Sequence, residues 1–270
     1  MRIALTGATG IVGGFIAHAV REAGHHLNPL PDYRLGDRPD LTGHDALIHA
    51  AFAHAPGRYR GGEGDDHARF RRLNLNGTLR LFDAAVGAGV SRVVFLSSRA
   101  VHDGQPAGTA LFDDLSPSPT TLYGEVKALA EAALADLPIA STSLRATGIY
   151  GPGRGNKWRD LFGDYLAGHP IAARIATEVH GEDLAAAALL ALREDAPATL
   201  NVSDLVLDRR DLLAEVAQLT GCAHPLPPRA DATTLRLPDC SGLARLGWRP
   251  GGMTKLRASL PRMLDPTRHL

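Results

Sequence analysis

The sequence predicts an α/β protein built on a doubly wound parallel sheet, with a small C-terminal lobe added to it. In the first half, short apolar strand patterns alternate with helical patterns, which favours a parallel sheet covered by helices on both faces. A glycine-rich turn joins the first strand to the first helix, and proline and glycine become frequent from about Gly151. We therefore expect one domain over residues 1–150 and a lobe over 151–270, some of whose segments return to the main sheet.

The individual strands and helices follow from local patterns. Apolar runs over 2–6, 45–49 and 92–96 predict buried strands, and shorter runs predict strands over 25–30 and 33–35. The apolar segment 10–23 ends at Gly24, as a helix should, and spaced leucines predict another helix over 69–88. The run 184–192 is flanked by charges and is too short to cross a bilayer, so we expect a buried helix there.

Composition and charge argue against several classes of protein. Lys+Arg and Asp+Glu number 29 each, so the formal net charge is zero, and nothing favours binding to nucleic acid or to a membrane surface. The 2 cysteines are too few for a disulfide framework or a zinc site, and the histidines and carboxylates form no metal-ligand pattern. Because the first strand starts at Arg2, we expect no signal or transit peptide and a cytoplasmic protein.

The turn from Thr6 to Gly13 predicts a dinucleotide site of the Rossmann type. Gly7 permits the tight turn, Gly10 lets the backbone approach a pyrophosphate, and Gly13 lets helix and strand pack closely. The helix N-terminus offers free N–H groups and a partial positive charge to the phosphates. A glycine-rich turn without a ligand is the alternative, and the position between a strand and a helix disfavours it.

Tyr123 and Lys127 are four residues apart and therefore share one face of a predicted helix. A tyrosine with its ordinary pKa near ~10 is a poor base at neutral pH. A nearby lysine ammonium stabilises the phenolate and lowers that pKa, so the tyrosine can take a hydroxyl proton while hydride leaves for a nicotinamide. A serine hydroxyl would fix the substrate oxygen. A surface pair without catalytic function is the alternative.

These motifs resemble those of the extended short-chain dehydrogenase/reductase family, the NAD-dependent epimerase/dehydratase group. The glycine spacing matches, Tyr123 and Lys127 match its Y-x-x-x-K, and further landmarks follow in the same order over nearly the whole chain. The resemblance implies a catalytic set of Ser98, Tyr123 and Lys127, with Ser98 rather than Ser97 in the catalytic position. It also implies a supporting role for Asn74, for which a helix-distorting residue without catalytic role is the alternative.

The resemblance further implies a cofactor and an assembly. The expected cofactor is NAD, with NADP as the alternative, and the expected assembly is a homodimer that binds a small-molecule substrate. Loop position alone predicts that the substrate side includes residues 52–60, Arg99, His102, Arg154 and Trp158. The expected cofactor contacts are Gly7, Thr9, Gly10, Ile11, Val12, Gly13, Asp32, Asp37, Ala50, Ala51, Phe52, Ser97, Tyr123 and Lys127.

Three departures from the family pattern bear on cofactor and substrate. The second strand should end on an acid for the adenine ribose or a base for a 2′-phosphate, but Pro31 stands there, with Asp32 and Arg34 close by. The connection that follows is so short that a helix is missing. Two nucleotide-sugar anchors of the family, an asparagine and an arginine, are replaced by Gly148 and Ala176.

The first expected function is an NAD(P)-dependent oxidoreductase acting on a secondary alcohol or ketone of a small, polar, sugar-like molecule. The alternatives are an NAD-dependent sugar or nucleotide-sugar epimerase, and a dinucleotide sensor that has lost catalysis; fold alone does not decide among them. We expect no sugar dehydratase, because Arg99 and Ala100 replace the acidic pair of those relatives. We also expect UDP-sugars to bind poorly, unless a register shift of two residues puts Arg174 in the missing arginine's place.

Overall fold

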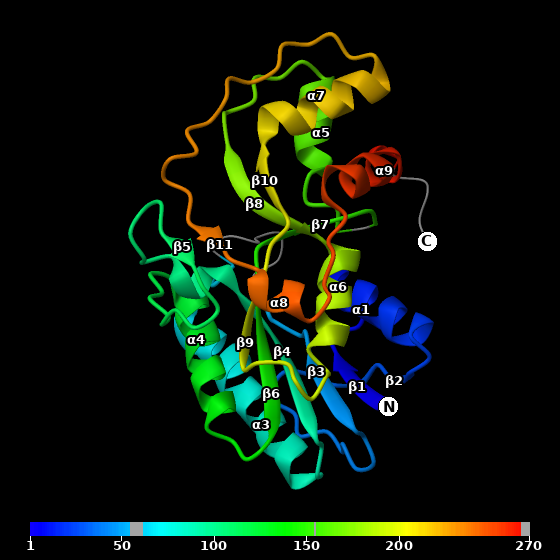
Figure 1. The fold of residues 1–270 in the computed structure, drawn as a ribbon, viewed down its shortest axis with the longest axis vertical. Coiled ribbons are helices and arrows are strands. Elements are labelled where there is room, and N and C mark those ends of the chain that lie inside the picture. Colours follow the sequence, from blue (N-terminus) through cyan, green and yellow to red (C-terminus); the bar gives the residue numbers. More distant parts are fainter. Residues whose placement is uncertain (55–61, 154, 266–270) are drawn as a thin grey trace.

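A computed structural model describes residues 1–54, 62–153 and 155–265 (Figure 1). All neighbouring strands of its main six-stranded sheet are parallel, in the order β2 (His26–Asn28), β1 (Arg2–Thr6), β3 (Ala46–His49), β4 (Arg92–Ser98), β6 (Ala140–Ala146) and β9 (Thr199–Val202). One face is covered by α1 (Ile11–Glu22) and α6 (Gly181–Leu190), and the other by α3 (Gly77–Gly87) and α4 (Leu122–Ala135). The predicted doubly wound parallel sheet is confirmed.

A second group of elements lies beyond one end of this sheet, at the top of Figure 1. Its sheet has the order β10 (Leu205–Asp208), β8 (Ile175–His180) and β7 (Gly148–Tyr150). The helices α5 (Arg159–Leu166), α7 (Arg209–Thr220) and α9 (Gly252–Leu264) pack with it around their own apolar cluster. The remaining short elements are α2 (His67–Arg71), α8 (Ser241–Arg245) and the paired strands β5 (Ala110–Leu111) and β11 (Leu237–Pro238). A domain boundary at residue 150 stays a prediction, and β9 and α6 belong to the main sheet and its cover.

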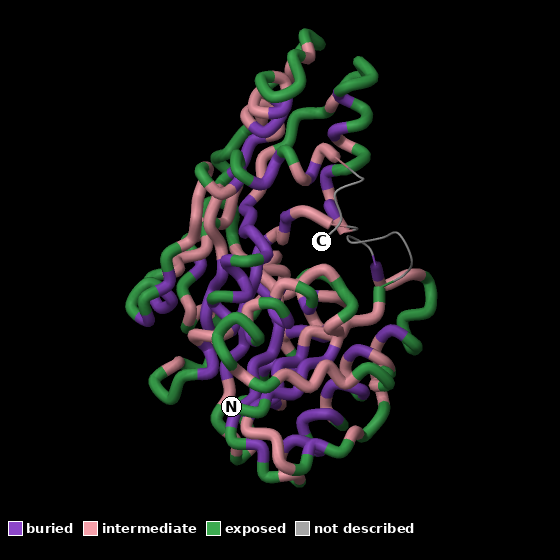
Figure 2. Tube along the Cα trace, turned by 90° about the vertical axis from the view of Figure 1, so that its right-hand side faces the viewer, coloured by how far each residue is buried: buried purple, intermediate pink, exposed green. Residues whose placement is uncertain are grey.

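Buried segments fill the interior of the lower part of the molecule (Figure 2). One apolar cluster joins the sheet to α1 and α6 through residues such as Ile16 and Leu184, and another joins it to α3 and α4 through Phe82 and Leu134. The predicted buried helix over 184–192 is therefore α6 and its following turn. This layering holds the carboxyl ends of β1, β3 and β4 at one edge, where such sheets bind ligands.

The predicted strand over 33–35 is wrong. Residues 29–45 form turns without a helix or a strand, which confirms that the connecting helix is missing. Leu30 has a φ of 42°, in the left-handed region, so the chain leaves the strand direction just after β2. Tyr33 then packs its ring against the cluster between the sheet and α3 instead of extending the sheet.

Candidate active site

The end of β4 and the start of α4 bring Ser98 and Tyr123 together. Thr121 caps α4, because its hydroxyl accepts the backbone N–H of Gly124 at 3.1 Å. A Cβ at Gly124 would lie 2.6 Å from the carbonyl oxygen of Ala100, so only glycine lets the helix approach the turn after Ser98 this closely. The Ser98 hydroxyl is close enough to the Tyr123 phenol to lower its pKa by hydrogen bonding. Two of the three predicted catalytic side chains are therefore neighbours.

The surroundings of Tyr123 hold its pKa above the ordinary value. Burial is the largest cause, the Glu63 and Asp103 carboxylates add to it, and the hydrogen bond with Ser98 opposes it. Oε1 of Glu63 also accepts the backbone N–H of Tyr123 at 3.1 Å. The net shift of this pKa is upward in the structure, and its lowering by Lys127 stays a prediction. The phenol is protonated at neutral pH and able to donate its proton.

The amine of Lys127 is buried against backbone and aromatic rings. Its Nζ donates to the Leu96 carbonyl at 2.5 Å, and it lies 4.3 Å from the ring centre of Phe52 and 4.6 Å from that of Phe95. Burial lowers the pKa of this amine to about 7, and the nearby Glu131 carboxylate opposes that shift only in part. Lys127 can therefore exchange a proton near neutral pH, as acid–base chemistry requires.

Phe52, predicted to contact the cofactor, bridges Lys127 and Tyr123. Its ring meets the Tyr123 ring edge-on, with centroids 5.2 Å apart, while its face covers Nζ of Lys127. The His54 ring lies beside both aromatic rings, 5.0 Å from that of Phe52 and 5.9 Å from that of Tyr123. The segment that follows β3 therefore forms one wall of the site.

Glu131 and Arg145 form a buried ion pair near Lys127. Two side chains that were predicted to contact ligands, Ser97 and His102, are hydrogen-bonded to this pair. Glu131 accepts a hydrogen bond from Nη2 of Arg145 at 2.8 Å and another from the Ser97 hydroxyl. His102 is fully buried, with its Nε2 3.1 Å from Nη1 of Arg145. Both side chains are thus bonded to this pair in the structure, and the contacts of Ser97 with the cofactor and of His102 with substrate stay predictions.

Asn74 is buried and supports the wall of the site rather than the catalytic side chains directly. It lies in a π-helical turn, Arg72–Asn76, between α2 and α3. Its Oδ1 accepts the N–H of Ala53 at 2.7 Å, and its Nδ2 donates to the Ala53 carbonyl at 3.0 Å. The residue predicted as part of the catalytic set thus acts as a positioning residue in this structure.

The glycine turn has a geometry that fits a dinucleotide phosphate. Gly7 has a φ of 72°, and a Cβ there would lie 2.7 Å from the backbone nitrogen of Ala51. A Cβ at Gly13 would lie 2.6 Å from the carbonyl carbon of Gly7, so helix and strand pack as closely as predicted. The first turn of α1, from Ile11, has no acidic residue and no capping side chain, which leaves its N–H groups for an anion. The other predicted contacts on this turn are Thr9, Gly10 and Val12.

The predicted adenine side is the turn after β2. Asp32 and Arg34 are exposed there, and Oδ2 of Asp37 accepts the backbone N–H of Arg34 at 2.8 Å. Tyr33 packs inward between them, and its buried hydroxyl has no hydrogen-bond partner among the described residues. The turn thus offers one guanidinium and two carboxylates to a ribose or a ribose phosphate.

The predicted substrate residues are only partly brought to the site. Arg99 follows Ser98 and forms an ion pair with Asp103 at 2.8 Å. Trp158 stacks on Tyr150 with ring centroids 4.9 Å apart and belongs to the apolar cluster of α5, α7 and α9, so its assignment to substrate is wrong. Arg154 lies outside the described residues, as do positions 55–60 of the predicted substrate loop.

The space at Gly148 is filled by neighbouring charged side chains. A Cβ there would collide with the Glu178 carboxylate and lie 2.6 Å from Nζ of Lys157, and these two residues form an ion pair. Ala176 lies in β8 opposite Leu207 of β10. A side chain at position 148 would therefore have to displace the ends of these two charged side chains, and position 176 carries only a methyl group.

Sequence reasoning missed two residues near the site, His49 and Glu63, and gave His54 no role of its own within the predicted substrate loop 52–60. His49 ends β3 immediately before the predicted cofactor contacts Ala50 and Ala51, so its position was an available signal. Glu63 and His54 reach Tyr123 from the segment between β3 and α2, and no local pattern predicts where such a segment lies.

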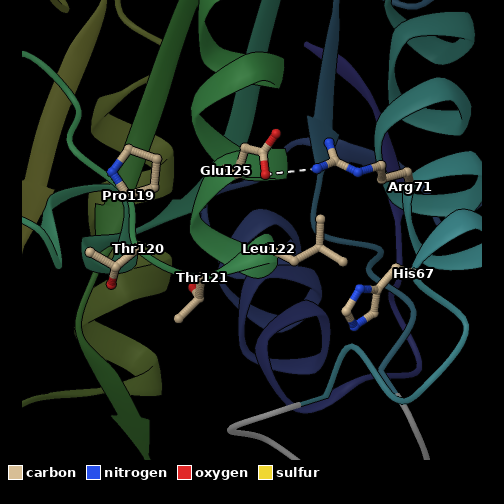
Figure 3. Close-up of a pocket in the computed structure, with 7 residues that line it drawn as sticks. All are labelled: His67, Arg71, Pro119, Thr120, Thr121, Leu122 and Glu125. Atoms are coloured by element: carbon tan, nitrogen blue, oxygen red, sulfur yellow. Dashed lines mark hydrogen bonds and ion pairs between the residues drawn. The ribbon is translucent and has the colours of Figure 1, made fainter.

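A separate pocket lies beside the first turn of α4 (Figure 3). Two of the side chains that line it, Arg71 and Glu125, form an ion pair 2.8 Å long. None of Ser98, Tyr123 and Lys127 lines this pocket, so it is not the predicted active site. Its lining residues are His67, Arg71, Pro119, Thr120, Thr121, Leu122 and Glu125.

The described part of the chain shows neither a metal cluster nor a membrane-spanning helix. No group of three or more His, Cys, Asp or Glu side chains there is placed to hold a metal ion. No helix within those same residues combines the length and apolar character that crossing a membrane needs.

The parallel sheet, its glycine turn and the polar groups at its carboxyl edge define a dinucleotide-dependent enzyme of the oxidoreductase or epimerase class. Sequence comparison then gives the particular family. The model of the NAD dependent epimerase/dehydratase family matches residues 3–203, and the chain belongs to that family. The resemblance that the motifs predicted is thereby confirmed.

The relatives within this family differ in what they act on. The UDP-glucose 4-epimerase of Corynebacterium glutamicum is 26% identical over 302 residues, covering 93% of this chain and 91% of that protein. A 3-diazoavenalumate denitrifying reductase of a Streptomyces species is 28% identical and covers 76% of each. The structure of the UDP-glucose 4-epimerase of Thermotoga maritima with UDP-glucose has a TM-score of 0.81 at 20% identity and covers 98% of both chains, which shows a shared fold.

Proposed function

We propose that the protein is an NAD(P)-dependent oxidoreductase that acts on a secondary alcohol or ketone of a small, polar, sugar-like molecule without a nucleotide. The observation that carries this proposal is the filled space at Gly148. A bound pyrophosphate must be paired with protein groups as it leaves water, and each charge-assisted hydrogen bond contributes about 1.5–3 kcal/mol. The ion pair of Glu178 and Lys157 takes the place of one expected anchor, and Ala176 takes the place of the other.

The catalytic roles follow from the geometry around Tyr123. The Ser98 hydroxyl, next to the Tyr123 phenol, holds the substrate oxygen beside it, and the phenol gives that oxygen a proton in ketone reduction. In alcohol oxidation the phenol first loses its own proton, and the phenolate then takes the hydroxyl proton of the alcohol. Lys127 stands one helical turn further along α4, and its pKa of about 7 lets it replace or remove that proton at neutral pH. When bound at the glycine turn, NAD supplies the hydride acceptor or, in its reduced form, the hydride.

NAD is the proposed cofactor, and NADP is the alternative. Asp32 is an exposed carboxylate on the turn after β2, where a ribose hydroxyl would be bound. The short connection between β2 and β3 leaves little chain with which to build a phosphate pocket. Arg34 on the same turn is the residue that would favour NADP, because a guanidinium pairs well with a phosphate.

An epimerase that oxidises and re-reduces its substrate on tightly held NAD is the second candidate. The match to the Corynebacterium epimerase over 93% of this chain favours it. The discriminating measurement is nicotinamide absorbance during turnover, since a dehydrogenase changes it stoichiometrically and an epimerase does not. A homodimeric assembly and a cytoplasmic location remain predictions.

Calorimetry with UDP-glucose and UDP-galactose, in the presence of NAD, tests the substrate class. We expect weak or no binding of either nucleotide sugar, and net reduction of NAD with a free sugar or polyol. Micromolar binding of a UDP-sugar, or interconversion of the two, would establish the epimerase candidate instead.

A further inference from the structure

A buried chain of hydrogen bonds connects the glycine strand, β3 and the helix that carries Asn74. Thr6 Oγ1 lies 2.6 Å from His49 Nδ1, and His49 Nε2 lies 3.0 Å from Thr78 Oγ1. The Thr78 hydroxyl donates to the Asn74 carbonyl at 2.7 Å, and Thr6 Oγ1 accepts the N–H of Ala51 at 3.2 Å. Their four side chains (Thr6, His49, Asn74 and Thr78) are at most 1% exposed.

Only one arrangement of protons satisfies this chain. Thr78 uses its hydroxyl proton on Asn74, so it must accept the Nε2–H of His49. Nδ1 of His49 then carries no proton and accepts the Thr6 hydroxyl, whose oxygen accepts from Ala51 in turn. The arrangement requires a neutral imidazole, and burial together with Lys127 lowers the pKa of His49 to about 3, which keeps it neutral.

The two ends of this network hold the backbone on both sides of Phe52. The Thr6 hydroxyl binds the N–H of Ala51, and the Asn74 side chain binds both the N–H and the carbonyl of Ala53. Phe52 itself has its ring over Lys127 and against Tyr123. A change at His49 would therefore shift the Phe52 ring, and with it the contacts of that ring with Lys127 and Tyr123.

We propose that His49 is a positioning residue for hydride transfer: through Thr6 and Thr78 it fixes residues 51–53, and so sets Phe52 against Lys127 and Tyr123. The inference rests on the proposed function, because it assigns residues 51–53 to the nicotinamide side of the site. His49 also packs against aromatic rings, 5.8 Å from that of Phe95 and 6.0 Å from that of Phe82. Replacing His49 itself would remove its ring contacts together with its hydrogen bonds, and the two effects could not be separated. The test therefore changes its hydrogen-bond partner Thr78.

Thr78→Val keeps the shape of the side chain and leaves the buried Nε2–H of His49 unpaired. Thr78→Ser keeps the hydroxyl and is the conservative rescue. Ser259→Ala is a matched control: the Ser259 hydroxyl likewise donates to a carbonyl four residues back, that of Lys255, at 2.8 Å. The same hydroxyl lies 3.1 Å from Nε2 of a second buried histidine, His180. This pair belongs to the group of elements around α9.

The readouts are the Kd for NAD, the unfolding temperature, and amide hydrogen exchange at Ala51 and Ala53. We expect Thr78→Val to weaken NAD binding about tenfold and to speed exchange at both amides, and Thr78→Ser to restore both. Ser259→Ala should lower the unfolding temperature comparably without changing either the Kd or that exchange. An unchanged Kd or unchanged exchange in Thr78→Val, or equal effects in Ser259→Ala, would overturn the proposal.

The exchange measurement separates this inference from the proposed function. If the wild-type protein binds neither NAD nor NADP, the proposed function fails, whereas faster exchange at Ala51 and Ala53 in Thr78→Val would still show that the hydrogen-bond chain fixes this segment. If NAD binds and exchange is unchanged in Thr78→Val, the positioning role of His49 fails while the proposed function stands.

Discussion

Replacing Lys127 by methionine is expected to stabilise the fold while removing activity. The side chain is 4% exposed, and burial lowers its pKa from 10.5 to about 7. At about 1.4 kcal/mol per pKa unit, the buried ammonium costs up to about 5 kcal/mol below pH 7, relative to the unfolded chain. Losing the hydrogen bond from Lys127 to Leu96 destabilises the variant by about 1.5–3 kcal/mol and so offsets part of this gain. The net gain is at least about 2 kcal/mol, which raises the unfolding temperature of a chain this size by at least about 4 °C.

The lowered pKa of Lys127 also sets the direction in which stability changes with pH. The folded amine loses its proton near pH 7 and the unfolded amine near pH 10.5, so between these values the unfolded chain binds more protons. Wild-type stability at this site therefore rises with pH across that window. Methionine has no proton to lose, so the advantage of Lys127→Met is largest below pH 7 and shrinks toward pH 10.5.

Urea unfolding of both proteins at about pH 6 and about pH 9 measures this difference. Lys255→Met is the matched control, because Lys255 forms an ion pair with Asp183 at 2.7 Å that raises its pKa, and its removal should destabilise the fold. A Lys127→Met protein that is less stable than wild type at the lower pH would refute the reasoning. In the same variant we expect loss of turnover and weaker NAD binding.

Three further predictions concern the site and its support. Tyr123→Phe keeps the ring and should lower turnover by about 100-fold or more with NAD affinity little changed; near-normal turnover would remove Tyr123 from its role. Titration should show tighter binding of NAD than of NADP, and tighter NADP binding that is lost in Arg34→Ala would reverse that preference. Arg145→Met leaves Glu131 buried without its cation and should cost about 3–5 kcal/mol in urea unfolding, and a loss under about 1 kcal/mol would show that the pair contributes little.

The parts of the site that could be predicted from sequence depend on short-range geometry. A left-handed φ at Gly7 and the close packing at Gly13 are demands of a strand–turn–helix connection, so the glycine spacing reveals them. The spacing of Tyr123 and Lys127 likewise follows from the pitch of one helix. The alternation of apolar strands and helices was sufficient for the parallel sheet, because each strand buries both faces.

The partners of each side chain were decided only by the tertiary structure. Ser97 and His102 look available for ligands in the sequence, yet β6 and α4 bring Arg145 and Glu131 against them and engage both. Trp158 lies in the apolar core that α5, which follows it directly, forms with α7 and α9 from further along the chain.

What the sequence by itself determined is the fold class, the glycine turn and the candidates for the catalytic side chains, because helix pitch and glycine geometry act over a few residues. Tertiary structure alone decided the protonation of those side chains. The pKa of Lys127 falls because β4 and the segment after β3 supply the Phe95 and Phe52 rings that exclude water from it. Burial is the sum of contacts among segments far apart in the chain, and no local pattern records that sum.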